Sequence, residues 1–552
     1  MIFLPKYNIN KVTWRWIVMA RNRIRNLAKG TVLLAGLMGI NGYAAASEKG
    51  EDLYQAELVF GDLFKQVQIE KVMGDYKTFV DAIPLYSSEK ILADYQAEKA
   101  AGNFNLKQFV LNNFKLPNAP TIQTVEKLPN MQQHLRQHWP KLVRHPQKTE
   151  TNSSLIQLPN PYIVPGGRFR EMFYWDSYFS IVGLIESDQQ GLTKGILDNF
   201  AYLIDQFGYV PNGNRSYFLS RSQPPFFAAT VLSYADKFGL DAVVQYIPQL
   251  EKEYLFWMDG YSEIPKQAVE GKHLIVLENG DYFNRYYGAL ETPRAEAYGK
   301  EYKWALQRTE AERPQYHRDL RAACESGWDF SSRWFADGKS KKTTHTMDVI
   351  PVDLNSLLYQ LESVLVQLTQ HTKQQNKAHF YTQRLNKRKQ LIDKYHFDGQ
   401  KGIYQDYNYK LKQFTGRESL AMMYPLFVGA ADKKTAASVA KYIDQHFLHA
   451  GGLVTTLTQT GEQWDYPNGW APLQYLSVKG LLRYQQNELA TTVMQRWLAL
   501  NEKVYQQDGK MMEKYNVVDI NLAAGGGEYP NQDGFGWTNG VAIAFDEMLQ
   551  AK

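Results

Sequence analysis

The 552-residue chain has little cysteine and none of the common short motifs for metals or nucleotides. Its one cysteine, Cys324, rules out an internal disulfide, so cysteine usage does not reveal the redox compartment. There is no HExxH pair, no pair of cysteines and no acidic ladder of an EF-hand. A Walker-type phosphate loop and a GxSxG nucleophile elbow are also missing. We therefore expect no metal, no nucleotide and no other cofactor.

The chain has no net positive charge once the amino terminus is set aside. Residues 1–29 carry seven Lys or Arg and no acid, and the short apolar run TVLLAGLMGI then leads to Ala44-Ala45-Ala46. This order predicts a secretory signal peptide over residues 1–46. The alternative is an uncleaved anchor, but the apolar run is short for a membrane span. Removing 1–46 lowers the formal net charge from +5 to −2, so we expect no nucleic-acid partner and no membrane contact after cleavage.

Low-complexity linkers are absent after residue 46, and strand-like alternation is rare and short, as at 272–278. Apolar residues instead recur at spacings of three and four, which predicts helices. The clearest stripes are at 192–207, 354–368, 436–447, 473–484 and 489–504. Gly208 and Pro472 suit a helix end and a first turn, and Asp353 is a predicted N-cap. We expect one mostly α-helical domain over residues 47–552 that displays its function on long loops.

The stretch 165–179, PGGRFREMFYWDSYF, mixes Gly, charged residues and six aromatics. Neither a buried helix nor a solvated loop suits that mixture, but the wall of a polar pocket does. Aromatic rings can cover the C–H faces of a sugar while Arg, Asp and Asn bind its hydroxyls. The alternative is a structural turn before an aromatic-capped helix. Similar mixtures recur at 211–225, 291–299, 324–334, 461–472, 513–517 and 525–540, so we expect these loops to converge on one pocket.

Carboxylates are the remaining candidates for catalysis. Acetal hydrolysis needs one carboxylic acid to protonate the leaving oxygen and one carboxylate to activate water or to attack. Asp329 lies between Trp328 and Phe330, and Glu513 lies in MMEKYNV, so apolar neighbours could keep an acid protonated. Asp329 could instead cap a helix over 331–335, and Glu513 could be an exposed helix-end residue. Spacing alone does not rank these two above Asp176, Glu325, Asp465 or Glu528.

PGGRFREMFYWDSYF and QWDYPNGWAP (463–472) closely resemble the two motifs of the trehalase family of glycoside hydrolases, above all its secreted bacterial members. The resemblance runs from about 55 to 549 and includes KTFVDAIP, GYVPNGNRSYFLSRSQPP, ESGWDFSSRW and GGGEYPNQDGFGWTNGV. It implies an all-α, six-hairpin α/α toroid in the periplasm that hydrolyses α,α-trehalose to two glucoses with inversion. Asp329 matches the family's general acid and Glu513 its general base. The positions that match its sugar-binding residues are Arg168, Trp175, Asp176, Asn212, Arg221, Ser222, Gln223, Arg294, Ala295, Glu296, Gly327 and Glu528.

The chain departs from the family at Arg294-Ala295-Glu296-Ala297, where the family usually shows Arg-Pro-Glu-Ser. Loss of the proline frees this loop and could weaken its hold on substrate without removing the chemistry. Two alternatives to a trehalase stay open: an inverting glucosidase that acts on other α-glucosides, and a non-catalytic periplasmic protein that binds a sugar. Inversion requires the two carboxyl groups to lie about 6.5–9.5 Å apart. We expect a monomer, because no self-association stripe is evident.

Overall fold

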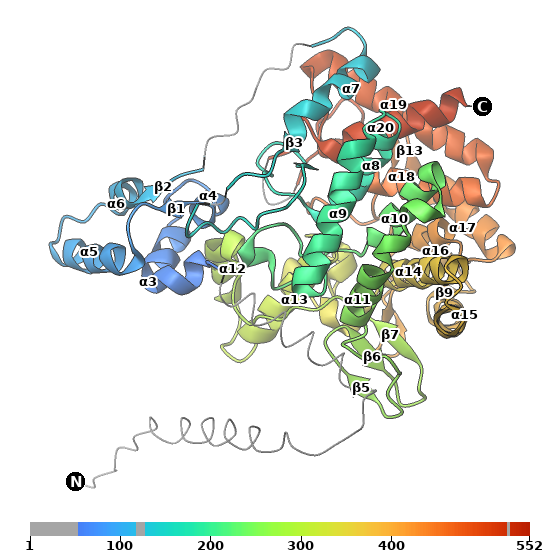
Figure 1. Ribbon diagram of the computed structural model, residues 1–552, viewed down its shortest axis with the longest axis horizontal. Coiled ribbons are helices and arrows are strands. Elements are labelled where there is room, and N and C mark those ends of the chain that lie inside the picture. The colour runs from blue at the N-terminus through green and yellow to red at the C-terminus, as the bar shows by residue number, and fades with distance from the viewer. Residues whose placement is uncertain (1–52, 118–126, 149, 527–529, 552) are drawn as a thin grey trace. The chain divides into compact units, whose positions relative to one another are not determined.

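The computed structural model describes residues 53–117, 127–148, 150–526 and 530–551, and the predicted signal peptide, residues 1–46, lies outside them. Within the described residues six helices form a closed ring, because each packs against the next and the last packs against the first (Figure 1). In chain order they are α8 (Tyr174–Ile185), α10 (Phe227–Phe238), α14 (Val352–His371), α16 (Tyr424–Val428), α18 (Ala471–Arg483) and α20 (Gly536–Gln550).

A second set of helices precedes the ring helices along the chain. Its members are α7 (Met131–Leu142), α9 (Gln190–Phe207), α11 (Ile247–Trp257), α15 (Gln375–Tyr395), α17 (Lys433–His446) and α19 (Asn487–Asp508). Five of them pack against ring helices, and α17 packs on the strands β10 and β13. Only α12 (Tyr298–Ala305) and α13 (Arg313–Glu325) interrupt the alternation, between α11 and α14. The described chain is therefore the all-α toroid of six hairpins that the family resemblance implies.

Local signals explain most helix boundaries. The stripe at 192–207 becomes α9, which ends at Gly208 in the left-handed conformation, with φ +86°. Pro472 occupies the first turn of α18, where a missing N–H has no cost. The prediction that Asp353 is an N-cap is wrong, because Pro351 holds that position and Asp353 lies in the first turn of α14. The Asp353 carboxylate instead pairs with the buried guanidinium of Arg333 at 2.8 Å.

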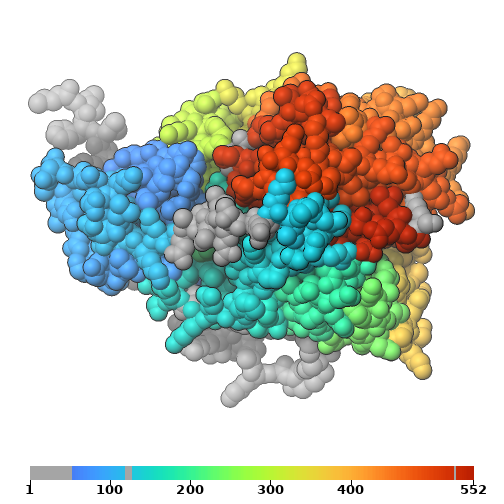
Figure 2. All heavy atoms as spheres, turned by 90° about the horizontal axis from the view of Figure 1, so that it is seen from above, coloured from blue at the N-terminus to red at the C-terminus, as the bar shows by residue number. Residues whose placement is uncertain are grey.

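The amino-terminal helices form a smaller core of their own. These helices and their strands are α3 (Ala56–Ile69), α4 (Lys77–Val80), β1 (Ile83–Pro84), α5 (Ser88–Ala100), α6 (Leu106–Asn113) and β2 (Phe114–Lys115). Phe60, Phe79 and Phe114 fill this core, with Phe114 edge-on to both of the others. Helix α3 packs on α12, and α4 packs on η4 (Ala295–Ala297), as the adjoining blue and yellow-green surfaces in Figure 2 show. The segment 71–77 is thereby held near η4, which lies between α11 and α12 along the chain.

The described strands are short, antiparallel and confined to loops. Those after β2 are β3 (Val143–Arg144), β4 (Tyr162–Ile163), β5 (Val269–Glu270), β6 (Leu274–Val276), β7 (Tyr282–Asn284), β8 (Val349–Ile350), β9 (Phe397–Asp398), β10 (Ile403–Tyr404), β11 (Tyr407–Asn408), β12 (Gln413–Phe414), β13 (Leu448–His449), β14 (Gly452–Leu453), β15 (Asn468–Gly469) and β16 (Tyr515–Asn516). β6 lies inside the predicted strand at 272–278. The pairing of β15 with β16 matters most here, because it joins the loop that carries Gln463 to the segment that carries Glu513.

Candidate active site

A cavity of about 410 Å³ is lined by the loops and helix ends that the sequence singles out. Trp175 and Asp176 come from the first turn of α8, and Glu296 comes from η4. The other predicted site residues in its lining are Arg168, Asn212, Arg221, Gln223, Arg294, Gly327, Asp329 and Glu513. Its aromatic walls are Phe169, Phe173, Trp175, Phe218, Trp464, Trp470, Phe535 and Trp537. The cavity thus combines charged groups with ring faces and is large enough for a small ligand.

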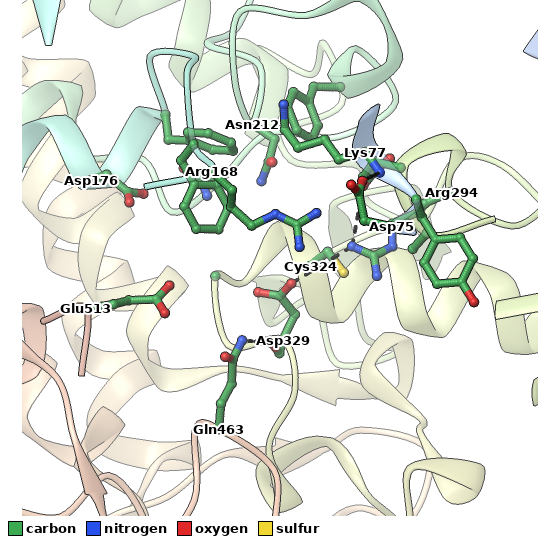
Figure 3. A pocket seen from close by; sticks show the side chains of 18 of the residues that line it. Asp75, Lys77, Arg168, Asp176, Asn212, Arg294, Cys324, Asp329, Gln463 and Glu513 are labelled. Atoms are coloured by element: carbon green, nitrogen blue, oxygen red, sulfur yellow. Dashed lines mark hydrogen bonds and ion pairs between the residues drawn. The ribbon is translucent and has the colours of Figure 1, made fainter. Parts of the chain in front are cut away.

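Asp329 and Glu513 reach into the same space from different segments. Figure 3 shows the Glu513 carboxylate on one side of the cavity, the Asp329 carboxylate across from it and Arg294 beyond Asp329. The Asp329 side chain is one-third exposed, and Arg294 Nη1 lies 3.9 Å from its Oδ2. Glu513 is buried, with Lys514 Nζ 3.1 Å from its Oε2. A ligand between the two walls meets a carboxyl group on each side.

Two arginines gather around one glutamate on the wall near Asp329. Arg221 Nη2 donates to Glu296 Oε1 at 2.8 Å, and Arg294 Nη1 lies 3.4 Å from the same oxygen. Burial opposes the charge of Glu296, but the two guanidinium groups outweigh it and hold the pKa of Glu296 at about 2. Nε and Nη1 of Arg221 have no hydrogen-bond partner within the described part of the chain. Buried donors of this kind are suited to the hydroxyls of a ligand.

Asp176 also lines the cavity, but its pKa is shifted in the opposite direction to that of Glu296. Burial raises the pKa of Asp176 well above its usual range, and the charges of Glu513 and Asp329 raise it further. Asp176 is therefore easier to protonate than an exposed aspartate, and in its protonated form it can donate a hydrogen bond to a sugar hydroxyl.

Two other candidate acids, Asp465 and Glu325, serve as structural anchors. The Asp465 carboxylate accepts from the Ser332 amide at 2.9 Å and from the Ser331 and Ser332 hydroxyls, so it fixes the chain just after Asp329. Glu325 accepts from the amides of Ser222 and Tyr287 at 2.9 and 2.7 Å. Neither of these two acids lines the cavity.

The alternative in which Asp329 is a helix cap is wrong. Ser331 is the N-cap of η5 (Ser332–Trp334), and its hydroxyl accepts from the Arg333 amide. The Asp329 carboxyl is therefore available to the cavity.

Two predicted sugar-binding residues are not in the cavity lining, and a third lies outside the described residues. Ser222 is fully buried and its hydroxyl donates to the Val210 carbonyl at 2.7 Å. Ala295 is buried, and its carbonyl accepts from Gln68 of α3 at 3.0 Å. Glu528 lies outside the described residues. Their contribution to binding stays a prediction.

Sequence reasoning missed the contribution of the amino-terminal segment. Asp75, Lys77 and the neighbouring Lys71, Gly74 and Tyr76 line the cavity. The only signal was the motif KTFVDAIP at 77–84, which entered through the family resemblance; it holds one aromatic and one acid but no Gly, Arg, Tyr or Trp. Gln463, Trp464 and Trp470 also line the cavity. They belong to the selected motif at 463–472 but were not named as site residues.

Two further searches of the described ranges gave no candidates. No three His, Cys, Asp or Glu side chains there gather closely enough to hold a metal ion. Over the same residues, no helix has both the length and the apolar character needed to cross a membrane.

Comparisons with known proteins identify the family of this chain. The family model named Trehalase matches residues 71–550. The periplasmic trehalase of Xanthomonas campestris pv. campestris (strain B100) is 43% identical over 88% of this chain and 85% of its own. That of Pseudomonas aeruginosa is 42% identical over 90% of each chain. The solved structure of the neutral trehalase from Saccharomyces cerevisiae is similar, with a TM-score of 0.59 and 26% identity over 70% of this chain and 73% of that one. The chain belongs to the trehalase family of glycoside hydrolases.

Proposed function

We propose that this protein hydrolyses α,α-trehalose to two molecules of glucose with inversion at one anomeric carbon. The observation that carries the proposal is the placement of Asp329 and Glu513 around one cavity of about 410 Å³, within a chain of the trehalase family. A cavity of that volume suits a disaccharide. The aromatic walls can cover the C–H faces of both glucose rings, and the guanidinium groups can bind their hydroxyls.

In the proposed mechanism Asp329 is the general acid and protonates the glycosidic oxygen. Glu513 is the general base and removes a proton from a water that attacks the anomeric carbon from the opposite face. The hydroxyls are bound by Arg168, Asp176, Asn212, Arg221, Gln223, Arg294 and Glu296, while Trp175 and Gly327 shape the cavity, and Ser222, Ala295 and Glu528 complete the predicted set. No metal or cofactor takes part.

The protein is proposed to act in the periplasm as a monomer. The predicted signal peptide, residues 1–46, directs export, and residues 47–552 are the single catalytic domain. The names of the relatives, periplasmic trehalases, support this location.

Proton NMR of the protein mixed with α,α-trehalose tests the proposal directly. Equal amounts of α- and β-glucose in the first minutes are expected, because an inverting enzyme makes one β-anomer and releases the other glucose as the α-anomer. Early α-glucose alone would mean retention and a different carboxylate pairing. If no glucose forms from trehalose, hydrolysis of maltose-like glucosides supports the glucosidase alternative, and trehalose binding without turnover supports the sugar-binding alternative.

A further inference from the structure

Two side chains connect Asp329 to Glu513. Gln463 Nε2 donates to the Asp329 carbonyl oxygen at 2.6 Å, as the dashed line in Figure 3 shows. Lys514 Nζ donates to Gln463 Oε1 at 3.3 Å. The same ammonium group lies 3.1 Å from Glu513 Oε2. One continuous path of polar contacts therefore runs from the proposed acid to the proposed base.

We propose that Gln463 and Lys514 are positioning residues that set the distance and orientation between Asp329 and Glu513. This inference rests on the proposed function, since it assigns roles relative to the acid and the base of that reaction. Neither residue acts on the substrate chemically. Gln463 holds the backbone at Asp329, and Lys514 holds one oxygen of the Glu513 carboxylate.

Burial makes this connection rigid. The Lys514 side chain is fully buried, and Glu513 and Gln463 are each 1% exposed. A buried ammonium group is stable only with close partners, so it holds both acceptors in place. Lys514 Nζ also lies 5.1 Å from the centroid of the Trp470 ring, which adds a cation–π contact.

The backbone at Gln463 and at Glu513 is also held by other hydrogen bonds. Trp470 Nε1 donates to the Gln463 carbonyl at 3.0 Å, and Trp537 Nε1 donates to the Glu513 carbonyl at 2.9 Å. The pairing of β15 with β16 places the two segments side by side. The remaining freedom lies in the side chains, and the Gln463–Lys514 contact removes it.

The chemistry is sensitive to this geometry. An inverting glycosidase must keep its carboxyl groups about 6.5–9.5 Å apart so that one water fits between the base and the sugar. A displacement of 1 Å can lower the rate about 100-fold. Loss of the connection should therefore reduce kcat more than it weakens substrate binding.

The first test compares Lys514→Met with wild type. We expect kcat for trehalose to fall about 100-fold while KM changes less than about threefold. Lys514→Arg should recover part of the activity. Lys503→Met, which changes a lysine bonded to the surface residue Asn521, is the matched control and should behave as wild type.

The second test is a double-mutant cycle. Gln463→Leu should also lower kcat, and the double variant with Lys514→Met should be little worse than either single variant, because one connection is lost in each case. If Lys514→Met does not fold, the test can still be made with Gln463→Leu and Gln463→Glu, because neither side chain has the amide group that donates to the Asp329 carbonyl. The inference is overturned by wild-type kcat in folded single variants, by additive losses in the double variant, or by a KM that rises as much as kcat falls. An inactive wild-type protein would instead overturn the proposed function.

Discussion

Gly327 turns directly over the indole ring of Trp175. Its φ is +76°, and a Cβ at this position would lie 2.8 Å from Trp175 Cζ2. The glycine is thus required twice, once by the left-handed backbone and once by the close approach of the ring. Trp175 in turn packs edge-on to Trp537 and lies 5.6 Å from Trp464, so a shift here would reach the aromatic wall of the cavity.

Gly327→Ala should therefore lower kcat/KM for trehalose by about 100-fold, because the added methyl displaces either Trp175 or the loop that carries Asp329. Steady-state kinetics and thermal unfolding measure the two effects. Gly416→Ala is the matched control, since Gly416 has φ +69° but no atom within 4 Å of an added Cβ. The control should lose only about 1 kcal/mol of stability from backbone strain and keep its activity. Equal kinetic losses in both variants would contradict the steric argument.

Asp329→Asn and Glu513→Gln should each lower kcat by a factor of about 100 to 10,000, the usual contribution of general acid–base catalysis. Both substitutions keep the shape of the side chain, so trehalose should still bind in isothermal titration calorimetry. A crystal structure with trehalose bound to either variant should show the carboxyl groups about 6.5–9.5 Å apart. Wild-type kcat in either folded variant, or a separation near 5 Å, would remove the assigned roles.

Glu296 should make the protein's stability depend on pH only under acidic conditions. The pKa of Glu296 is lowered to about 2 in the folded state, so its stabilising contribution is present above its unfolded value of 4.5 and is lost as the pH falls through about 2. The difference in unfolding free energy between wild type and Glu296→Gln should be constant above about pH 5, on the order of 3 kcal/mol, and shrink below pH 4. Urea unfolding across this range measures it. A difference that grows on acidification would contradict the pairing with Arg221 and Arg294.

The sequence predicts a mostly α-helical chain and most of the cavity for clear physical reasons, whereas the toroid is predicted only through the family resemblance. Helical stripes such as that of α9 repeat their apolar face, and the local end at Gly208 fixes the boundary. The site loops are recognisable because charged and aromatic residues occur together there, as in the segment that contains Trp175 and Asp176. Such local patterns need no knowledge of the folded structure.

Roles set by long-range partners could not be predicted. Aspartate is a common N-cap residue, which is why the sequence predicts that Asp353 is one. In the folded chain its carboxylate instead neutralises the buried guanidinium of Arg333. Asp465 looks as suitable for catalysis as Asp329, and only the folded chain shows that serine hydroxyls and an amide surround it. Asp75 reaches the cavity only because the amino-terminal core packs beside η4.

The amino-terminal segment should contribute to substrate affinity through Lys77. Its Nζ lies 2.5 Å from Asp81 Oδ2 and 2.9 Å from Glu171 Oε1, so it links α4 to the loop before α8. Lys77→Met removes a positive charge from beside two buried carboxylates and should lower the free energy of unfolding by about 3–5 kcal/mol. Because Lys77 and its neighbours Asp75 and Tyr76 line the cavity, KM for trehalose should also rise.

The matched control for this variant is Lys90→Met. Lys90 pairs with Asp94 on the exposed surface of α5, where an ion pair contributes about 0–1 kcal/mol. Thermal unfolding and trehalose kinetics of the two variants separate the effects. An unchanged KM in folded Lys77→Met would show that the segment does not support binding.

His273 should make the protein less stable under alkaline conditions. Its Nε2 lies 3.3 Å from Glu325 Oε2 and its Nδ1 lies 3.5 Å from Asp259 Oδ1. Burial opposes the charge of His273, but these two carboxylates outweigh it and raise the pKa of His273 to about 9. The stabilising contribution is fully present below the unfolded value of 6.5 and is lost as the pH rises through about 9.

The unfolding free energy of wild type should therefore exceed that of His273→Gln by roughly 3 kcal/mol at pH 6, and the difference should vanish above about pH 10. His371→Gln is the control, because His371 pairs with an exposed aspartate and its loss should change little. Glu325 also accepts the Ser222 amide between Arg221 and Gln223, so KM should rise over the same alkaline range in wild type. A pH-independent difference in stability would show that His273 is neutral in the folded protein and acts only by packing.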